Sequence, residues 1–158
     1  MNRSFFTLAA AAVLTLTATP ALCAEPSPLA GGKALYEKTC ATCHALERSL
    51  AKKTDRAGWE GTIKKMVANG AKLDESQSGL ILGYLTAKST FETKCNACHD
   101  IQKPLTAIKN PEQWQATVKR MAAMKPGPIT DADAGAITLY LSLVTPVKPA
   151  APAAPAYK

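Results

Sequence analysis

Histidine is scarce in this chain, with two residues among 158. Aromatic residues make up only 6% of the sequence, so a core must consist mainly of Ala, Leu, Ile and Val. No segment alternates polar and apolar residues as a half-exposed strand does, whereas several segments repeat apolar residues at helical spacing. These periodic segments exclude a collagen-like or wholly disordered chain and predict an all-α fold.

Long apolar runs are also missing, apart from one near the N-terminus. There Arg3 precedes the apolar stretch 5–16, which is too short to span a bilayer and is typical of a secretory signal peptide. Cleavage near Ala24 would remove Cys23 with the leader; an uncleaved membrane anchor is the alternative. We therefore expect residues 1–24 to be a signal peptide and the mature protein to be exported to the periplasm.

Acidic residues are outnumbered, with Asp+Glu 12 against Lys+Arg 19. Removing residues 1–24 takes away Arg3 and no acid, so the net charge falls from +7 by one. An exported basic protein suits an acidic protein partner or an anionic membrane better than nucleic acid, because no Arg-rich run with interleaved aromatic residues is present. We assign most of the lysines to solvated helix faces.

Both histidines lie in copies of one motif, Cys-x-x-Cys-His, and the motifs contain four of the five cysteines. Each copy is preceded by an aromatic residue and followed by the string Trp-x-x-Thr-[Ile/Val]-Lys-[Lys/Arg]-Met. The matched pairs in the two copies are Tyr36 and Phe91, Cys40 and Cys95, Cys43 and Cys98, His44 and His99, Trp59 and Trp114, Met66 and Met121, and Tyr84 and Tyr140. The sequence therefore predicts an internal duplication, with one domain over 25–86 and a second over 87–144.

Each copy is expected to contain a few short helices. One helix leads into each motif, over 32–41 and 87–96, and a second covers each Trp-to-Met string. Pairs typical of capping boxes start the closing helices at Asp74 and Thr130, and Asn110 precedes a proline as an N-cap does. Residues 145–158 are rich in Pro and Ala, which predicts an extended, disordered tail.

The motif Cys-x-x-Cys-His is the attachment signature of c-type haem. Its thiols reach the two vinyl groups of one porphyrin, and the adjacent His lies against the iron as the proximal ligand. A zinc site, a disulfide framework and a thioredoxin-like redox pair are the alternatives. None of them explains why a His follows the second Cys in both copies. We therefore predict two covalent haems, on Cys40 and Cys43 with His44, and on Cys95 and Cys98 with His99.

The sixth iron ligand cannot be another histidine of this chain, because both are proximal. His/Met ligation is typical of electron-carrying cytochromes c, and Met66 and Met121 occupy matching positions. A methionine on a helical stripe is more often part of the core. Met124 is an alternative ligand in the second copy, because it precedes a stiff Pro-Gly-Pro loop. We also expect the two Trp to pack against the haem edge, with the indole N–H toward a propionate.

The order of small residue, aromatic residue, motif, Trp, Met and closing amphipathic helix resembles the class I cytochrome c domain, once in each half. The Trp-to-Met string more narrowly resembles the haem domains of quinohaemoprotein amine dehydrogenases and related small dihaem cytochromes. The resemblance implies two tandem domains in which Gly32 meets Tyr84 and Ala87 meets Tyr140. Two departures are present. The usual glycine after the motif is replaced, and the proline that supports the proximal His in relatives has a counterpart, Pro104, only in the second half.

The expected function is that of a periplasmic dihaem carrier of single electrons between redox proteins with acidic docking surfaces. No histidine is left for general-base catalysis and the carboxylates do not form paired acids, so an enzyme is not expected. The alternatives are an open-site haem enzyme or gas sensor, and the cytochrome subunit of a larger periplasmic dehydrogenase or oxidase.

Overall fold

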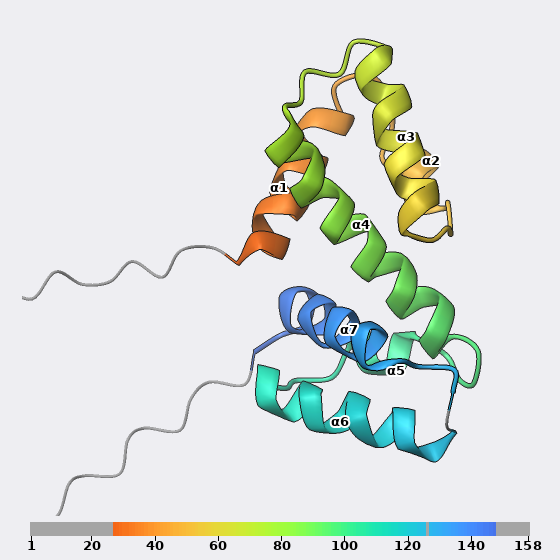
Figure 1. Ribbon diagram of the computed structural model, residues 1–158. Coiled ribbons are helices and arrows are strands. Elements are labelled where there is room, and N and C mark those ends of the chain that lie inside the picture. The colour runs from red at the N-terminus through yellow and green to blue at the C-terminus, as the bar shows by residue number, and fades with distance from the viewer. Residues whose placement is uncertain (1–26, 126, 148–158) are drawn as a thin grey trace, which may run out of the picture.

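The part of the chain that the structure describes is all-α. This structure is a computed structural model, and it describes residues 27–125 and 127–147. Over these residues no strand is present, and the helices are α1 (Pro28–Cys40), α2 (Glu47–Leu50), α3 (Arg56–Ala68), α4 (Glu75–Cys95), α5 (Gln102–Leu105), α6 (Pro111–Met124) and α7 (Asp131–Val144) (Figure 1). The expected signal peptide and most of the expected tail lie outside the described residues.

The predicted starts of α4, α6 and α7 are confirmed, whereas α1 begins at Pro28 and not at residue 32. Capping boxes begin α4 at Asp74 and α7 at Thr130, and a third begins α6 at Asn110, with Pro111 in the first turn. In each box the side chain of the cap accepts a hydrogen bond from a backbone N–H that has no partner inside the helix. Asp55 caps α3 in the same way, accepting from Gly58 N at 2.9 Å. Local polar residues thus set these helix boundaries.

The helix α4 belongs to both halves of the chain. The sequence predicted a separate opening helix over 87–96, but this segment is the C-terminal half of one helix of 21 residues. No Gly or Pro lies between Tyr84 and Lys103, so nothing in the local sequence interrupts the helix. The domain boundary expected at 86/87 therefore falls inside α4.

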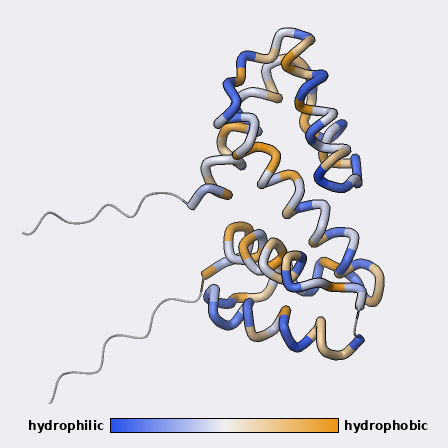
Figure 2. The backbone as a smooth tube through the Cα atoms, viewed as in Figure 1, coloured by the Kyte–Doolittle hydropathy of each residue, from blue (hydrophilic) through white to orange (hydrophobic). Residues whose placement is uncertain are grey.

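The same packing occurs twice around this shared helix. In the first half α1 and α3 pack against α4, and in the second half α4 and α6 pack against α7 (Figure 1). Hydrophobic residues are concentrated in the central part of α4 and in α7, the two helices that form the middle of the molecule (Figure 2). Helix α4 thus closes the first half and opens the second.

A row of four aromatic rings joins the two halves. Tyr36 and Tyr84 have ring centroids 5.7 Å apart, and the matching pair Phe91 and Tyr140 are 5.3 Å apart. Tyr84 and Tyr140, 6.2 Å apart, connect the two pairs. Burial, together with the nearby Glu92 carboxylate, raises the pKa of Tyr140 to about 12, so this phenol stays neutral. The row forms the centre of the apolar core between the halves.

Gly32 lies where α1 crosses α4, as the resemblance implied. A Cβ atom at this position would be 2.1 Å from the backbone oxygen of Leu80 and 3.3 Å from Cβ of Tyr84. Ala87, the matching residue in the second half, is buried at 3% exposure. Only a residue without a side chain allows α1 to lie this close to α4.

We expect Gly32→Ala to destabilise the protein by about 3 kcal/mol, because the two helix backbones would have to move apart. The neighbouring Gly31 provides a matched control, since a Cβ there would have no atom within 4 Å. Gly31→Ala should stabilise the helix by about 0.5–1 kcal/mol. Denaturant unfolding measures both. Equal effects of the two substitutions would contradict the close crossing.

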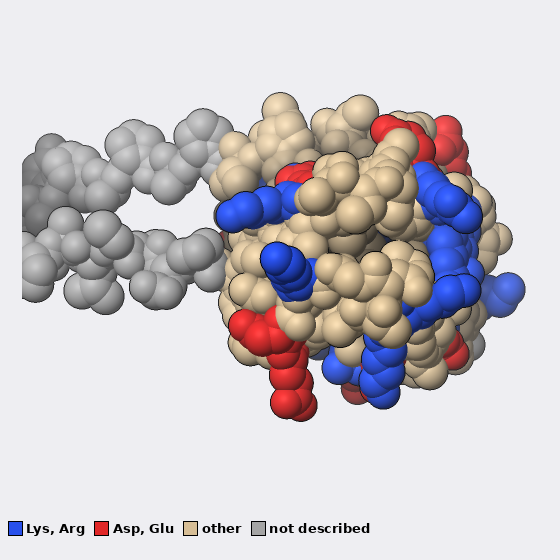
Figure 3. Space-filling view, turned by 90° about the horizontal axis from the view of Figure 1, so that it is seen from above, with Lys and Arg blue, Asp and Glu red and all other residues tan. Residues whose placement is uncertain are grey.

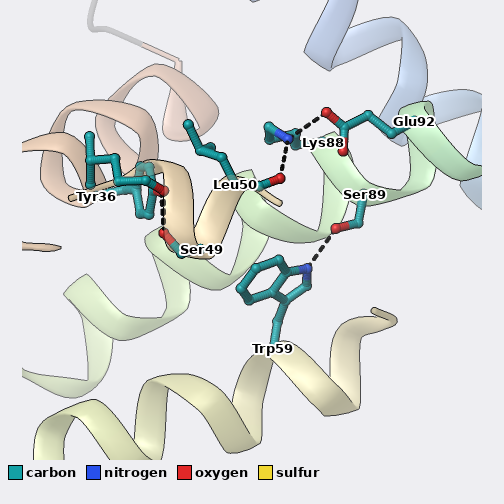
Figure 4. Close-up of polar contacts among 8 residues, drawn as sticks. Tyr36, Ser49, Leu50, Trp59, Lys88, Ser89 and Glu92 are labelled. Carbon is teal, nitrogen blue, oxygen red and sulfur yellow. Dashed lines mark hydrogen bonds and ion pairs between the residues drawn. The ribbon is translucent and has the colours of Figure 1, made fainter. Parts of the chain in front are cut away.

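A lysine–glutamate pair is buried in the second half and exposed in the first. Lys88 Nζ donates to Glu92 Oε1 at 2.5 Å and to the carbonyl oxygen of Leu50 at 3.3 Å (Figure 4). The two side chains are 11% and 16% exposed. The matching pair Lys33 and Glu37, at 2.6 Å, is 36% and 47% exposed. Lys88 thus meets the end of α2 at Leu50, whereas Lys33 and Glu37 on α1 are more exposed to solvent.

We expect Lys88→Met to cost about 3 kcal/mol, because it leaves the buried Glu92 carboxylate without its cation. Lys33→Met, at the matching exposed pair, should cost no more than about 0.5 kcal/mol. Chemical denaturation of the two variants side by side provides the measurement. A similar small effect at both positions would show that the second pair is hydrated in solution.

Candidate functional site

Each Cys-x-x-Cys-His motif begins at the last residue of a helix. Cys40 ends α1 and Cys95 ends α4, and both are partly buried, whereas Cys43 and Cys98 are exposed in the turns that follow. None of these four cysteines forms a disulfide. Burial raises the pKa of Cys40, and burial together with Cys98 raises that of Cys95 to about 11. Cys40 and Cys95 are therefore neutral thiols at pH 7.

Both histidines are oriented in the same way. His44 Nδ1 lies 3.1 Å from the carbonyl oxygen of Ala45, and His99 Nδ1 lies 3.2 Å from that of Asp100. A carbonyl oxygen only accepts, so this contact places a proton on Nδ1 and, in the neutral imidazole, leaves the lone pair on Nε2. An imidazole held by a backbone carbonyl at one nitrogen and free at the other is the usual arrangement of a metal-ligating histidine.

The second motif faces a cavity of about 600 Å³. Its wall includes Cys95, Cys98 and His99 from the motif, Trp114 and Met121 from α6, and Met124 from the end of that helix. The volume is within the range of cofactor sites. Two thiols, an imidazole and two thioethers therefore line one concave space, and this donor set fits a c-type haem.

The structure places both candidate methionines of the second half on this cavity. Met121 is half-buried, while Met124 is 74% exposed. In the first half, Met66 is half-buried on α3. A cavity of about 610 Å³ between α3 and the start of α4 is lined by Ile63 and Val67, but neither Met66 nor the first motif lines it.

The two tryptophans are buried in matching positions, and each indole N–H already donates to a hydroxyl group of the protein. Trp59 Nε1 donates to Ser89 Oγ at 2.7 Å (Figure 4). Trp114 Nε1 donates to Thr145 Oγ1 at 2.8 Å. The expectation that each indole N–H meets a propionate is therefore wrong. Thr145, which the sequence assigned to the tail, is buried at 6% exposure.

Sequence reasoning also missed a lysine beside each tryptophan. Lys52 Nζ lies 5.6 Å from the ring centroid of Trp59, and Lys109 Nζ lies 4.9 Å from that of Trp114. The two lysines are out of register in the repeat, so comparing the copies residue by residue does not reveal them. The one feature of the repeat that bears on these lysines is the threonine of the Trp-x-x-Thr string. In each half the lysine donates a hydrogen bond to this threonine.

The supporting residues behind the two histidines also differ. Pro104 lies in α5 and lines the cavity with His99. In the first half Ser49 takes its place, and its Oγ is 2.6 Å from the hydroxyl of Tyr36 (Figure 4). Ser49 Oγ also donates to the carbonyl oxygen of Leu46. The surroundings of the two motifs are thus not identical.

Two absences are confined to the described residues. Within residues 27–125 and 127–147, no group of three or more His, Cys, Asp or Glu side chains is placed to hold a metal ion. Over the same residues, no helix is long and apolar enough to cross a membrane.

Comparison with known families gives one match. Residues 27–78 match the family described as cytochrome c oxidase, cbb3-type, subunit III. The matched segment contains Cys40, Cys43, His44 and Met66. Searches of the curated proteins and of the solved structures return no match. The family match supports a c-type cytochrome with covalently bound haem c, and hence electron transfer with redox partners.

Proposed function

We propose that the protein is a periplasmic dihaem c-type cytochrome that carries single electrons between redox proteins and is not itself an enzyme. The observation that carries the proposal is the cavity of the second half, where a complete motif and a methionine of α6 come together. The family match covers the first half, and the packing of α1, α3 and α4 recurs in α4, α6 and α7. One haem in each half accounts for both observations.

The residues would divide the work in the same way in each half. Cys40 and Cys43 would hold one haem through thioether bonds. His44, with its proton fixed on Nδ1, would present Nε2 to the iron, and Met66 would be the opposite ligand. When bound, the haem supplies an iron that changes its charge by one electron.

In the second half Cys95 and Cys98 would hold the haem, with His99 as the proximal ligand. Met121 is the proposed distal ligand because it matches Met66 and is the more buried of the two methionines on the cavity. Met124 is the alternative. The C-terminal end of α4 places Cys95, and the carbonyl oxygen of Asp100 orients His99, so both residues would be held ready for the haem.

The charge of the protein suits acidic partners. The chain has Lys+Arg 19 against Asp+Glu 12, and basic side chains gather on the right-hand side of the view in Figure 3. Opposite charges steer two proteins into contact and speed their association at low salt. Export by the predicted signal peptide would place this exchange in the periplasm.

Reductive titration combined with carbon monoxide tests the proposal. We expect two electrons to be taken up per chain, a reduced spectrum that carbon monoxide leaves unchanged, and oxidation by an acidic redox protein that slows as salt is added. A haem that binds carbon monoxide readily in the wild-type protein would instead favour a gas-binding or catalytic role. Copurification with a dehydrogenase or oxidase would identify a subunit rather than a free carrier.

A further inference from the structure

Each half of the molecule holds one lysine ammonium against its tryptophan and its threonine. Lys109 Nζ lies 4.9 Å from the centroid of Trp114 and donates to Thr117 Oγ1 at 2.6 Å. In the first half Lys52 makes the same two contacts. Its Nζ lies 5.6 Å from the ring centroid of Trp59 and donates to Oγ1 of the matching Thr62 at 2.5 Å. The threonine hydroxyl donates to a carbonyl of its own helix, so its oxygen is available as an acceptor.

The ammonium position recurs although the sequence position does not. Trp59 and Trp114 match in the repeat, but Lys52 precedes its tryptophan by seven residues and Lys109 precedes its own by five. The residue that matches Lys52 is Ala107. Two different backbone positions thus deliver a cation to the same place, which points to a role for the charge at that place rather than for the segment that carries it.

Neither ammonium is paired with a carboxylate among the described residues. The ion pairs found there involve other lysines, and the hydrogen-bond partner of each of these two is a threonine oxygen. An ammonium has three donors, so two remain after the bond to threonine. The side chain of Lys109 lines the same cavity as Cys95, Cys98 and His99. The other cationic side chains on this cavity are Lys94, which pairs with Asp133, and Lys103, Arg120 and Lys125; among these cations Lys109 is the one held on the Trp114 ring. A cation held on an aromatic face at a cofactor cavity favours an anionic group of the cofactor.

We propose that Lys109 binds a propionate carboxylate of the haem in the second half, and that Lys52 does the same in the first. This inference rests on the proposed function. Once thiols have taken the vinyl groups, the two propionates are the only anionic groups at the porphyrin edge. The indole N–H groups are already bound to Ser89 and Thr145, so the lysines take the role that the sequence assigned to the tryptophans.

The charge of the lysine would set how the haem responds to pH. An ammonium beside a carboxylate favours its ionised form and lowers its pKa. Without the ammonium, the propionate pKa rises, and the negative charge of the ionised propionate stabilises ferric over ferrous iron. Loss of Lys109 should therefore lower the reduction potential of one haem and move the pH-dependent step of that potential upward by about one pH unit.

Spectroelectrochemical titration of both haems from acid to alkaline pH tests this in the holoprotein. Lys109→Met should lower the reduction potential of one haem and move the pH-dependent step of that potential upward. Lys109→Arg keeps the charge and should leave the potential and its step at the wild-type values. Lys119→Met is the matched control: Lys119 is exposed on the same helix, α6, and does not line the cavity. Lys52→Met against its exposed neighbour Lys53→Met repeats the comparison in the first half.

Haem content, measured by intact mass in every variant, separates the two proposals. A wild-type protein without covalent haem would overturn the proposed function. Two haems with identical titrations for Lys109→Met and Lys119→Met would overturn only the role of the lysines. If Lys109→Met fails to retain its haem, Thr117→Val supplies the test, because it frees the ammonium without removing it. A smaller shift in the same direction then supports the assignment, and an unchanged titration contradicts it.

Discussion

Replacing Cys40 and Cys43 together with alanine is expected to remove one of two haems from the protein. Intact mass of the wild type should exceed the chain mass from Glu25 onward by two haems, and acid-acetone should extract neither. The double variant should lose one haem mass. Replacing Cys95 and Cys98 should remove the other. A double variant that keeps both haems would contradict attachment at these cysteines.

The loss of one haem should also unfold much of the half that held it, because ligand binding to the native state stabilises the fold. A unit of this size buries too little surface to be stable without such help. Helix α4 belongs to both halves, and Tyr84 and Tyr140 pack against each other across them. We therefore expect the disorder to spread into the other half. Circular dichroism at the helix band measures this, and an unchanged spectrum would show that the cavity residues form a sufficient core alone.

Replacing Met66 with alanine is expected to change the iron chemistry of the first haem. The weak near-infrared sulfur-to-iron band of that haem should disappear, its potential should fall, and it should bind carbon monoxide. The physical reason is that a thioether is soft and neutral, so it favours the ferrous state more than water or a nitrogen ligand does. Near-infrared and reduced-minus-carbon-monoxide spectra measure the change.

In the second half, the comparison of Met121→Ala with Met124→Ala decides between two residues of the same cavity. The variant that loses the band identifies the ligand. The other should keep the wild-type spectrum; if it is Met121, its half-buried position implies a packing cost of about 2 kcal/mol. If none of the three methionine variants alters the spectrum, the methionines belong to the core. An open-site haem would then be favoured over an electron carrier.

The sequence alone determined the features that depend on neighbouring residues. The spacing within each Cys-x-x-Cys-His motif is a local property, and so are the capping boxes that begin α4, α6 and α7. The repeat itself is visible because the matched residues keep a nearly constant offset along the chain, with one residue inserted in the second half before Tyr140. The close approach of α1 to α4 at Gly32 was also expected from the sequence, because the resemblance to the class I cytochrome c domain implied that Gly32 meets Tyr84.

The tertiary structure decided which side chains meet across the helices. Ser89 and Thr145 lie about thirty residues from the indole groups they bind, and no motif connects them. Lys52 and Lys109 reach equivalent places from positions that do not match.

The pairs Lys33–Glu37 and Lys88–Glu92 show most directly that the repeat in the sequence does not predict burial. The two pairs match in the repeat, yet only the second is buried, and Lys88 of that pair also donates to the carbonyl oxygen of Leu50 at the end of α2. Spacing along one helix fixes which charges can pair, whereas burial depends on which other helix packs over them, and that is set by contacts between residues far apart in the sequence.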